Sequence, residues 1–268
     1  MIRDTYSRID QHLHLVCQLI AKVNKLMVPA QADDSHTNLY FDTISKRILG
    51  RWFVNSEGQR YIMSLHLKSL QLECLDTHYQ PVVSIDYTQK TKVETTDLLS
   101  KALINKGIIT DVLPASMHYD IPAYSFADEK FNRLLRKDIV IWWRYRELAN
   151  IACSTLLGHL GVTGEIRIWP HHFDTGIYVE PTDRYGIGFG LAMADDLIDE
   201  PYFYLSFYAL DGSKIDYTQL PSLKQGDWKI SDGFKGAVLP IAELEGIQLR
   251  KANRMIARFI RAGLQLMR

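Results

Sequence analysis

The hydrophobic positions of the first ninety residues change from helical to strand-like spacing. Apolar residues recur every three or four positions between Asp4 and Val28, which predicts an amphipathic helix ended by Pro29. Strand-like runs then predict antiparallel strands at 39–44, 47–54 and 81–87, and apolar residues at alternate positions predict two more at 61–67 and 70–74. The alternation slips by one residue at Lys68-Ser69, where we expect a bulge or a tight turn.

Helical spacing returns in the middle of the chain. We expect Thr95 or Thr96 to cap a helix that runs to Asn105. An irregular connection at 114–122 follows.

The capping-box pattern at 125–128 predicts the start of a second, long helix that reaches Leu160. A continuous helix of that length would extend for about 50 Å, so we expect a break near Lys137.

The last hundred residues repeat the order of strands followed by a helix. Alternation predicts strands at 165–180, 186–195 and 201–209. A polar region with several glycines and prolines extends to Leu239, and a C-terminal helix begins at Ile241 or Ile247 and ends near Met267. These patterns predict an α+β fold with helices packed on one face of antiparallel sheet. We expect one domain over 1–268; two similar helix–strands–helix halves, 1–113 and 123–268, are the alternative.

Three consecutive predicted strands divide their side chains in the same way, because successive residues of a strand point to opposite faces. One face is apolar: Trp169, His171, Phe173, Ile177, Val179, Ile187, Phe189, Leu191, Met193, Phe203, Leu205 and Phe207. The other face combines polar, small and tyrosine side chains: His172, Asp174, Tyr178, Glu180, Gly188, Gly190, Ala192, Ala194, Tyr202, Tyr204, Ser206 and Tyr208. In a meander, the apolar face would pack against helices and leave the second face available.

We predict that this second face is a binding surface. Small residues within a strand often mark close approach of a ligand or another backbone, and ligand sites set a few polar groups around an apolar floor. The candidate residues are His172, Asp174, Gly188, Gly190, Tyr202, Tyr204 and Tyr208. The expected occupant is a small molecule or a protein partner, including a second copy of the chain. A solvated face, or one covered by a helix, is the alternative, since antiparallel sheets often expose one face.

Catalytic chemistry is a weaker interpretation of the same residues. His171 and His172 would point to opposite sides of a regular strand, and His172 with Asp174 gives only two of the three protein ligands of a catalytic zinc site. No P-loop, HExxH or GxSxG motif occurs. We assign no metal, cofactor or catalytic residue; a hydrolase that uses His172 and Asp174 with Tyr202 or Tyr204 is the enzymatic alternative.

The predicted C-terminal helix carries the one local concentration of charge. Arg250, Arg254, Arg258 and Arg261 fall on one stripe, and no acidic residue follows Ile247. Such helices can contact phosphate backbones. Over the whole chain, 31 basic and 31 acidic residues cancel, which argues against nucleic acid as the main partner and leaves it a second alternative.

The composition indicates a soluble cytoplasmic protein. Cys17, Cys74 and Cys153 are widely spaced and odd in number, which favours reduced core cysteines over a disulfide framework. The N-terminus lacks the apolar run of a secretion signal, and no segment has the roughly 18 consecutive apolar residues of a membrane span.

Two short motifs resemble those of a family of uncharacterised, mostly bacterial proteins of about this length. Residues 169–174, Trp-Pro-His-His-Phe-Asp, are similar to that family's W-P-x-H-F-D run, and residues 200–204, Glu-Pro-Tyr-Phe-Tyr, to its E-P-Y-F-Y segment. The opening Arg-Asp-Thr-Tyr at 3–6 agrees with it too. The chain departs from the family at 192–196, Ala-Met-Ala-Asp-Asp, where relatives carry a glycine- and proline-containing loop. The family is a domain of unknown function, so the resemblance implies membership and no activity.

Overall fold

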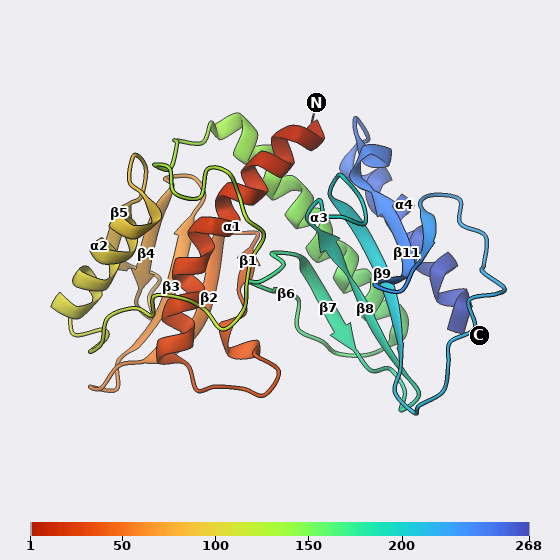
Figure 1. Ribbon diagram of the computed structural model, residues 1–268, viewed down its shortest axis with the longest axis horizontal. Coiled ribbons are helices and arrows are strands. Elements are labelled where there is room, and N and C mark those ends of the chain that lie inside the picture. The colour runs from red at the N-terminus through yellow and green to blue at the C-terminus, as the bar shows by residue number, and fades with distance from the viewer. Residues whose placement is uncertain (1, 268) are drawn as a thin grey trace. The chain divides into compact units, whose positions relative to one another are not determined.

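The computed structural model describes residues 2–267, which form four α-helices and two antiparallel sheets (Figure 1). This arrangement confirms the predicted α+β class. The helices are α1 (Ile2–Met27), α2 (Lys92–Asn105), α3 (Arg136–Leu160) and α4 (Leu249–Gly263). The first sheet contains β1 (Tyr40–Asp42), β2 (Arg47–Val54), β3 (Arg60–His66), β4 (Gln71–Leu75) and β5 (Pro81–Asp86). The second contains β6 (Arg167–Ile168), β7 (Thr175–Val179), β8 (Tyr185–Ala192), β9 (Tyr202–Ala209), β10 (Asp227–Ile230) and β11 (Lys235–Pro240).

The chain divides into two compact units, each built around one sheet. The five-stranded unit comprises residues 8–143 and 168–173, and the six-stranded unit comprises 144–167, 174–267 and the first turns of α1 up to Ser7. None of the helices between residues 2 and 267 combines the length and hydrophobicity needed to span a lipid bilayer.

The five-stranded sheet is a meander in the order β1-β2-β3-β4-β5, and α1 packs closely on one of its faces. A Cβ on Gly50 would lie 2.6 Å from the Asn24 side chain and 2.8 Å from that of Ile20, so glycine permits the helix to approach β2. The predicted slip near Lys68 is a turn between β3 and β4 in which Leu70 adopts a left-handed conformation, with φ 58°.

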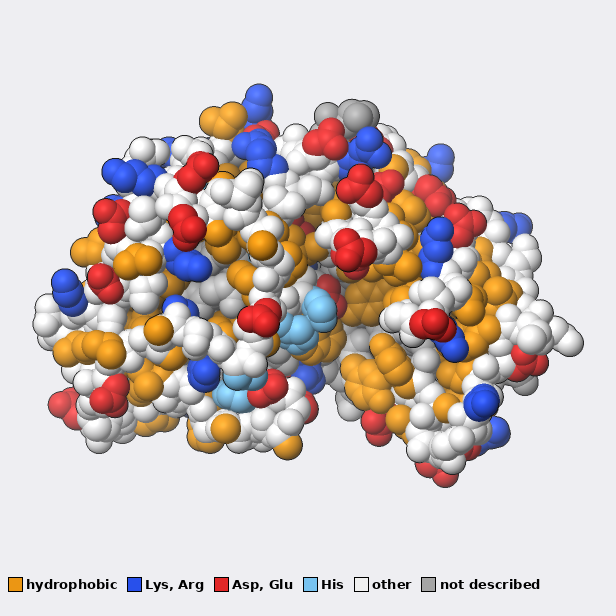
Figure 2. Space-filling view, in the orientation of Figure 1, with side chains coloured by type: hydrophobic (Ala, Val, Ile, Leu, Met, Phe, Trp, Pro, Cys, Tyr) orange, Lys and Arg blue, Asp and Glu red, His pale blue; other side chains and the backbone are white. Residues whose placement is uncertain are grey.

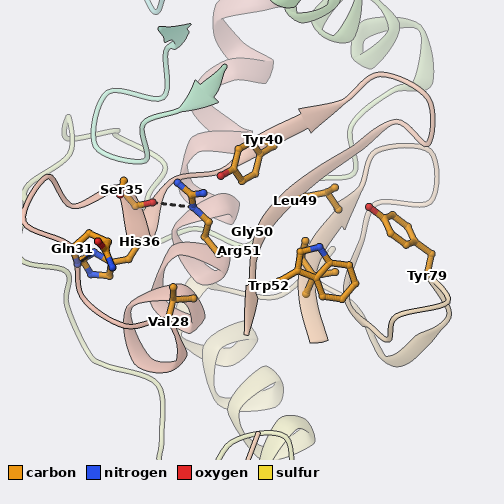
Figure 3. Close-up of a pocket in the computed structure, with 11 residues that line it drawn as sticks. Val28, Gln31, Ser35, His36, Tyr40, Leu49, Gly50, Arg51, Trp52 and Tyr79 are labelled. Atoms are coloured by element: carbon orange, nitrogen blue, oxygen red, sulfur yellow. Dashed lines mark hydrogen bonds between the residues drawn. The ribbon is translucent and has the colours of Figure 1, made fainter. Parts of the chain in front are cut away.

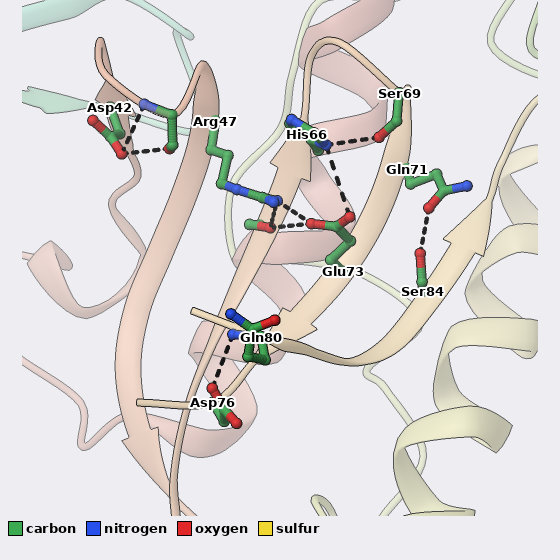
Figure 4. A network of polar contacts seen from close by, with 11 residues as sticks. Asp42, Arg47, His66, Ser69, Gln71, Glu73, Asp76, Gln80 and Ser84 are labelled. Carbon is green, nitrogen blue, oxygen red and sulfur yellow. Dashed lines mark hydrogen bonds and ion pairs between the residues drawn. The ribbon is translucent and has the colours of Figure 1, made fainter. Parts of the chain in front are cut away.

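The other face of this sheet carries a buried polar network (Figure 4). Arg47 donates to the Glu73 carboxylate and to the Ser64 hydroxyl, and His66 lies 3.9 Å from the second Glu73 oxygen. Cross-strand pairing puts these residues on one face, because Arg47 pairs with His66 and Ser64 pairs with Glu73. Burial and the nearby Arg47 charge lower the pKa of His66.

Helix α1 has a buried polar stripe at every fourth position, which fixes the irregular segments around it. Asp10 accepts from the Trp142 indole at 2.6 Å, and the two ring nitrogens of His14 contact the Tyr124 hydroxyl and the Pro170 carbonyl. Further along the helix, Gln18 also donates to the Pro170 carbonyl and Lys22 to the Ala115 carbonyl. The segment predicted to be irregular, 114–122, therefore has an ordered attachment.

Two predicted helix starts are wrong. Helix α2 is capped by Thr91, whose hydroxyl accepts from the Glu94 amide while the Glu94 carboxylate accepts from the Thr91 amide, and not by Thr95 or Thr96. The pattern at 125–128 opens no helix, because the backbone of Phe131 is paired with Gln89 and Lys90. Helix α3 begins only at Arg136, next to the predicted break.

The six-stranded sheet has the order β10-β11-β9-β8-β7-β6, and helices pack on one face as expected. A Cβ on Gly263 of α4 would lie 2.5 Å from the Leu205 side chain, and the Cys153 thiol of α3 points at the Phe189 carbonyl. The hairpin β10–β11 was not predicted, because it lies in the polar region with several glycines and prolines that extends to Leu239. A 3-10 turn occupies 241–244, and α4 begins at Leu249, near the later of the two predicted starts.

Candidate functional site

Strands β7, β8 and β9 form the predicted meander, and their pairing register aligns the candidate residues on one face. Gly188 pairs with Tyr178 on one side and Ser206 on the other, and Gly190 pairs with Tyr204. The opposite face is buried throughout at Ile177, Val179, Ile187, Phe189, Leu191, Phe203, Leu205 and Phe207. We call the first face the tyrosine face: Tyr178, Gly186, Gly188, Gly190, Ala192, Tyr202, Tyr204, Ser206 and Tyr208.

Tyrosine side chains lie over the glycines of the tyrosine face. A Cβ on Gly190 would lie 2.8 Å from the Tyr204 hydroxyl, and one on Gly188 would lie 3.4 Å from the Tyr208 ring. A Cβ on Gly186 would overlap the Tyr178 hydroxyl. Gly188 and Gly190 are themselves buried, so the surface that a partner meets consists of tyrosine rings.

Two of these rings are the exposed part of the face. Tyr178 and Tyr208 are 42% and 49% exposed, and their centroids lie 5.7 Å apart in an edge-to-face arrangement. Tyr178 donates to Glu180, and Ser206 donates to the Tyr208 hydroxyl, which fixes both phenols. Figure 2 shows hydrophobic side chains, among which tyrosine is coloured, gathered over β7 and β8.

The other two tyrosines are anchored to carboxylates, that of Asp174, which is buried, and that of Asp195, which is exposed. Tyr204 donates to Asp174 at 2.6 Å, and Tyr202 donates to Asp195 at 2.7 Å. Burial and the accepting carboxylate raise the pKa of both phenols. Asp174 is only 8% exposed, so its hydrogen bond with Tyr204 ties the start of β7 to the centre of β9.

Buried groups of α3 lie close to that anchor. Arg146 is fully buried and donates to the Thr175 hydroxyl at 2.7 Å. Burial, with the nearby Asp174 carboxylate, raises the pKa of the Cys153 thiol, which suits a core cysteine and not a nucleophile.

The hexapeptide at 169–174 is a turn, so the predicted strand at 165–180 is wrong for these residues. The Phe173 amide donates to the Trp169 carbonyl at 2.6 Å, Phe173 has a φ of 55°, and β7 begins only at Thr175. Strand alternation therefore does not separate His171 from His172, and their rings lie 4.4 Å apart.

His171 is half-buried against Tyr119 and His172, and it is not the core residue of the apolar face that alternation predicted. Its burial and the neighbouring His172 lower its pKa to about 4. His172 is exposed and belongs to the five-stranded unit, whereas the other six candidates belong to the six-stranded unit. Within residues 2–267, no three histidine, cysteine, aspartate or glutamate side chains converge as metal ligands.

A hollow in the five-stranded unit was missed by the sequence analysis (Figure 3). Its volume is about 630 Å³, and it is lined by Val28, Gln31, Ser35, His36, Tyr40, residues 49–52, Ile62 and Tyr79. Arg51 and Trp52 come from a predicted strand, but nothing in their spacing signals a cavity, because it depends on a bulge in the pairing of β2 with β3.

No protein-family model, curated protein or solved structure matches this chain. The resemblance of residues 169–174 and 200–204 to an uncharacterised family stays a prediction.

Proposed function

We propose that the protein is a cytosolic binding module that holds a protein partner on its tyrosine face. The main support for this proposal is the exposed edge-to-face pair of Tyr178 and Tyr208. The pair lies on a face where tyrosine side chains cover the glycines. Cys17, Cys74 and Cys153 are buried and form no disulfide, which supports a reducing compartment.

The chemistry of this face favours a protein over a small molecule. Tyrosine is enriched at protein interfaces because its rigid ring supplies contact area at a small cost in side-chain entropy, and serine and glycine accompany it in antibody paratopes. The glycine floor is filled by rings, so the face offers area and hydroxyl groups, not depth. A second copy of the chain is one protein that could fill this role.

Site-specific photo-crosslinking in cells tests the proposal. A benzophenone amino acid replaces Tyr208 in one variant and Ile230 in the control; Ile230 is 43% exposed and lies on the opposite face of the same sheet. We expect a discrete protein adduct from position 208 only. An adduct of twice the chain mass would identify a second copy as the partner. No adduct, or the same adducts from both positions, would refute the proposal.

The hydrolase alternative depends on cooperation of His172 with Asp174. Asp174 already accepts the Tyr204 hydrogen bond in a buried setting, which gives it a structural role in the tyrosine face. The pairing with His172 stays a prediction, and replacing His172 by Ala tests it without disturbing Asp174.

A second candidate function, binding of a nucleic-acid strand, is favoured by helix α4. Its basic side chains are all exposed: Arg250, Lys251, Arg254, Arg258 and Arg261. The apolar side of the helix is buried at Ala252, Ile256, Phe259 and Ile260, so it is not available for insertion into a lipid surface. A fixed row of arginines favours contact with phosphates of an extended strand.

A further inference from the structure

A β-bulge in the five-stranded sheet shapes the hollow at the edge of β2. The register shifts between Leu49, which pairs with Ser64, and Trp52, which pairs with Ile62, so Gly50 and Arg51 together oppose one residue of β3. The extra residue brings Leu49 and Trp52 to the same face of the sheet. Bulges of this kind re-aim side chains and occur frequently beside binding sites.

One end of the hollow is aromatic and apolar. The Trp52 and Tyr79 rings have centroids 6.2 Å apart at an angle of 67°, and Leu49 and Ile62 are buried beneath them. Arg60 lies beside this end, with its guanidinium 5.5 Å from the Trp52 ring centroid. A planar ring would find two aromatic side chains and an apolar floor here.

The other end is polar, and a cation separates the two ends (Figure 3). Arg51 donates from Nε to the Ser35 carbonyl, and its guanidinium lies 4.9 Å from the Tyr40 ring centroid. His36 and Gln31 line the far end, where the His36 ring accepts from the Gln31 amide. These contacts hold Arg51 at a defined position on the wall.

Tyr79 occupies a backbone position that normally belongs to glycine. The turns at 55–59 and 76–80 have the same hydrogen bonds: the first residue pairs with the fifth, and the fourth donates to the first carbonyl. The fourth residue is Gly58 in one turn, with φ 81°, and Tyr79 in the other, with φ 60°. A bulky side chain is disfavoured there, and Tyr79 is 41% exposed, so burial in a core does not account for its presence.

We propose that the hollow is a binding site for a small planar aromatic anion, a ring that carries a carboxylate or phosphate. The ring packs against the edge-to-face pair of Trp52 and Tyr79, and the anionic group faces Arg51. The volume of about 630 Å³ falls within the range of small-molecule sites. This site is separate from the tyrosine face in composition and belongs to the other unit.

Calorimetry with the full chain tests the site. The probes are 2-naphthoate, its neutral amide 2-naphthamide, and adenosine 5′-monophosphate. Comparing 2-naphthoate with its amide isolates the effect of the negative charge, and comparing the two anions distinguishes carboxylate from phosphate. We expect at least one anion to bind with a Kd below about 1 mM and at least about tenfold more tightly than the amide. Absence of binding by both anions, or an affinity for the amide equal to that for the more tightly bound anion, would overturn the proposal.

Two variants separate binding from folding. Tyr79→Gly removes the ring and suits the left-handed backbone, so we expect an unchanged or higher Tm and an anion affinity about tenfold lower. The control is Ile230→Ser, which removes a comparably exposed apolar side chain from the other sheet and should bind the anion as the wild type does. Equal anion affinity in wild type and Tyr79→Gly would contradict the site.

Discussion

At the scale of single residues, the glycines of β8 are explained by the side chains that occupy the space beside them. A methyl group on Gly190 would lie 2.5 Å from the Thr175 carbonyl and 2.8 Å from the Tyr204 hydroxyl. We expect Gly190→Ala to lower the free energy of unfolding by about 2 kcal/mol, the usual cost of an overpacked site. Urea denaturation measures the change.

A second glycine provides the control for that experiment. Gly158 lies in α3 with nothing within 4 Å of an added Cβ. Gly158→Ala should therefore stabilise the protein by about 0.5 kcal/mol through helix propensity. A Gly190→Ala variant as stable as Gly158→Ala would show that the rings of the tyrosine face move at no cost.

His12 makes the stability of the protein depend on pH. Its ring is buried against Tyr87 and Phe131, and this burial lowers its pKa from 6.5 to about 4. The unfolded chain therefore binds the proton more tightly, so stability is fully present above pH 6.5 and is lost as the pH falls toward 4. The loss over that interval is about 3 kcal/mol.

The variant His12→Phe keeps the aromatic packing and removes the titration. Nε2 of His12 has no hydrogen-bond partner among the described residues, so phenylalanine leaves no acceptor or donor unpaired there. We expect wild type to lose about 3 kcal/mol more than this variant between pH 7 and pH 4 in urea denaturation. Parallel pH profiles would show that His12 does not titrate as inferred.

At the scale of elements, hydrophobic runs predicted the strands better than local motifs predicted the helix ends. Arg47–Val54 was predicted with its observed bounds, because a run rich in apolar residues ends there at the turn-forming residues 55–58. The motif at 125–128 failed because a capping box needs a helix to follow, and tertiary backbone bonds hold Phe131 outside one.

The candidate site shows the same division between local and long-range information. The two faces of β7, β8 and β9 could be predicted, since register follows from a regular meander. The turn at 169–174 could not, because its conformation depends on contacts of Pro170 with His14 and Gln18, over 150 residues away in sequence. The hollow depends on a bulge, which leaves no signature in the hydrophobic pattern.

The buried ion pair of Arg47 and Glu73 lies in the five-stranded sheet. Replacing one of the two residues should lower the stability of the protein more than replacing both. Both side chains are nearly buried, at 12% and 6% exposed, so Arg47→Met would leave a carboxylate without its charged donor. We expect a loss of about 3 kcal/mol for Arg47→Met, much of it restored in Arg47→Met/Glu73→Leu. A double-mutant cycle measures the coupling; additive losses would show that the two groups do not interact.

At the scale of the whole molecule, a net charge of zero conceals an uneven distribution. Five exposed cations occupy α4, a helix of 15 residues without an acidic side chain. Fields of exposed charges decay within about 10 Å at 0.1 M salt, so a strand close to α4 would be attracted by this row and hardly repelled by distant acids. The local charge of α4, and not the net charge of the whole chain, therefore determines the attraction of a nucleic-acid strand.

The row of exposed cations predicts salt-dependent binding of a single-stranded nucleic acid through α4. With four arginines on phosphates, the logarithm of the association constant should fall with the logarithm of salt concentration with a slope of about −3. Fluorescence anisotropy of a labelled 20-nucleotide strand, about the length expected to span such a site, measures the slope. Replacing Arg254 and Arg258 by Gln should reduce the magnitude of the slope by about 1.4. The control is Arg60→Gln, which changes an exposed arginine of the other unit and should leave the slope unchanged. Equal slopes for the three proteins would place any nucleic-acid binding elsewhere than on α4.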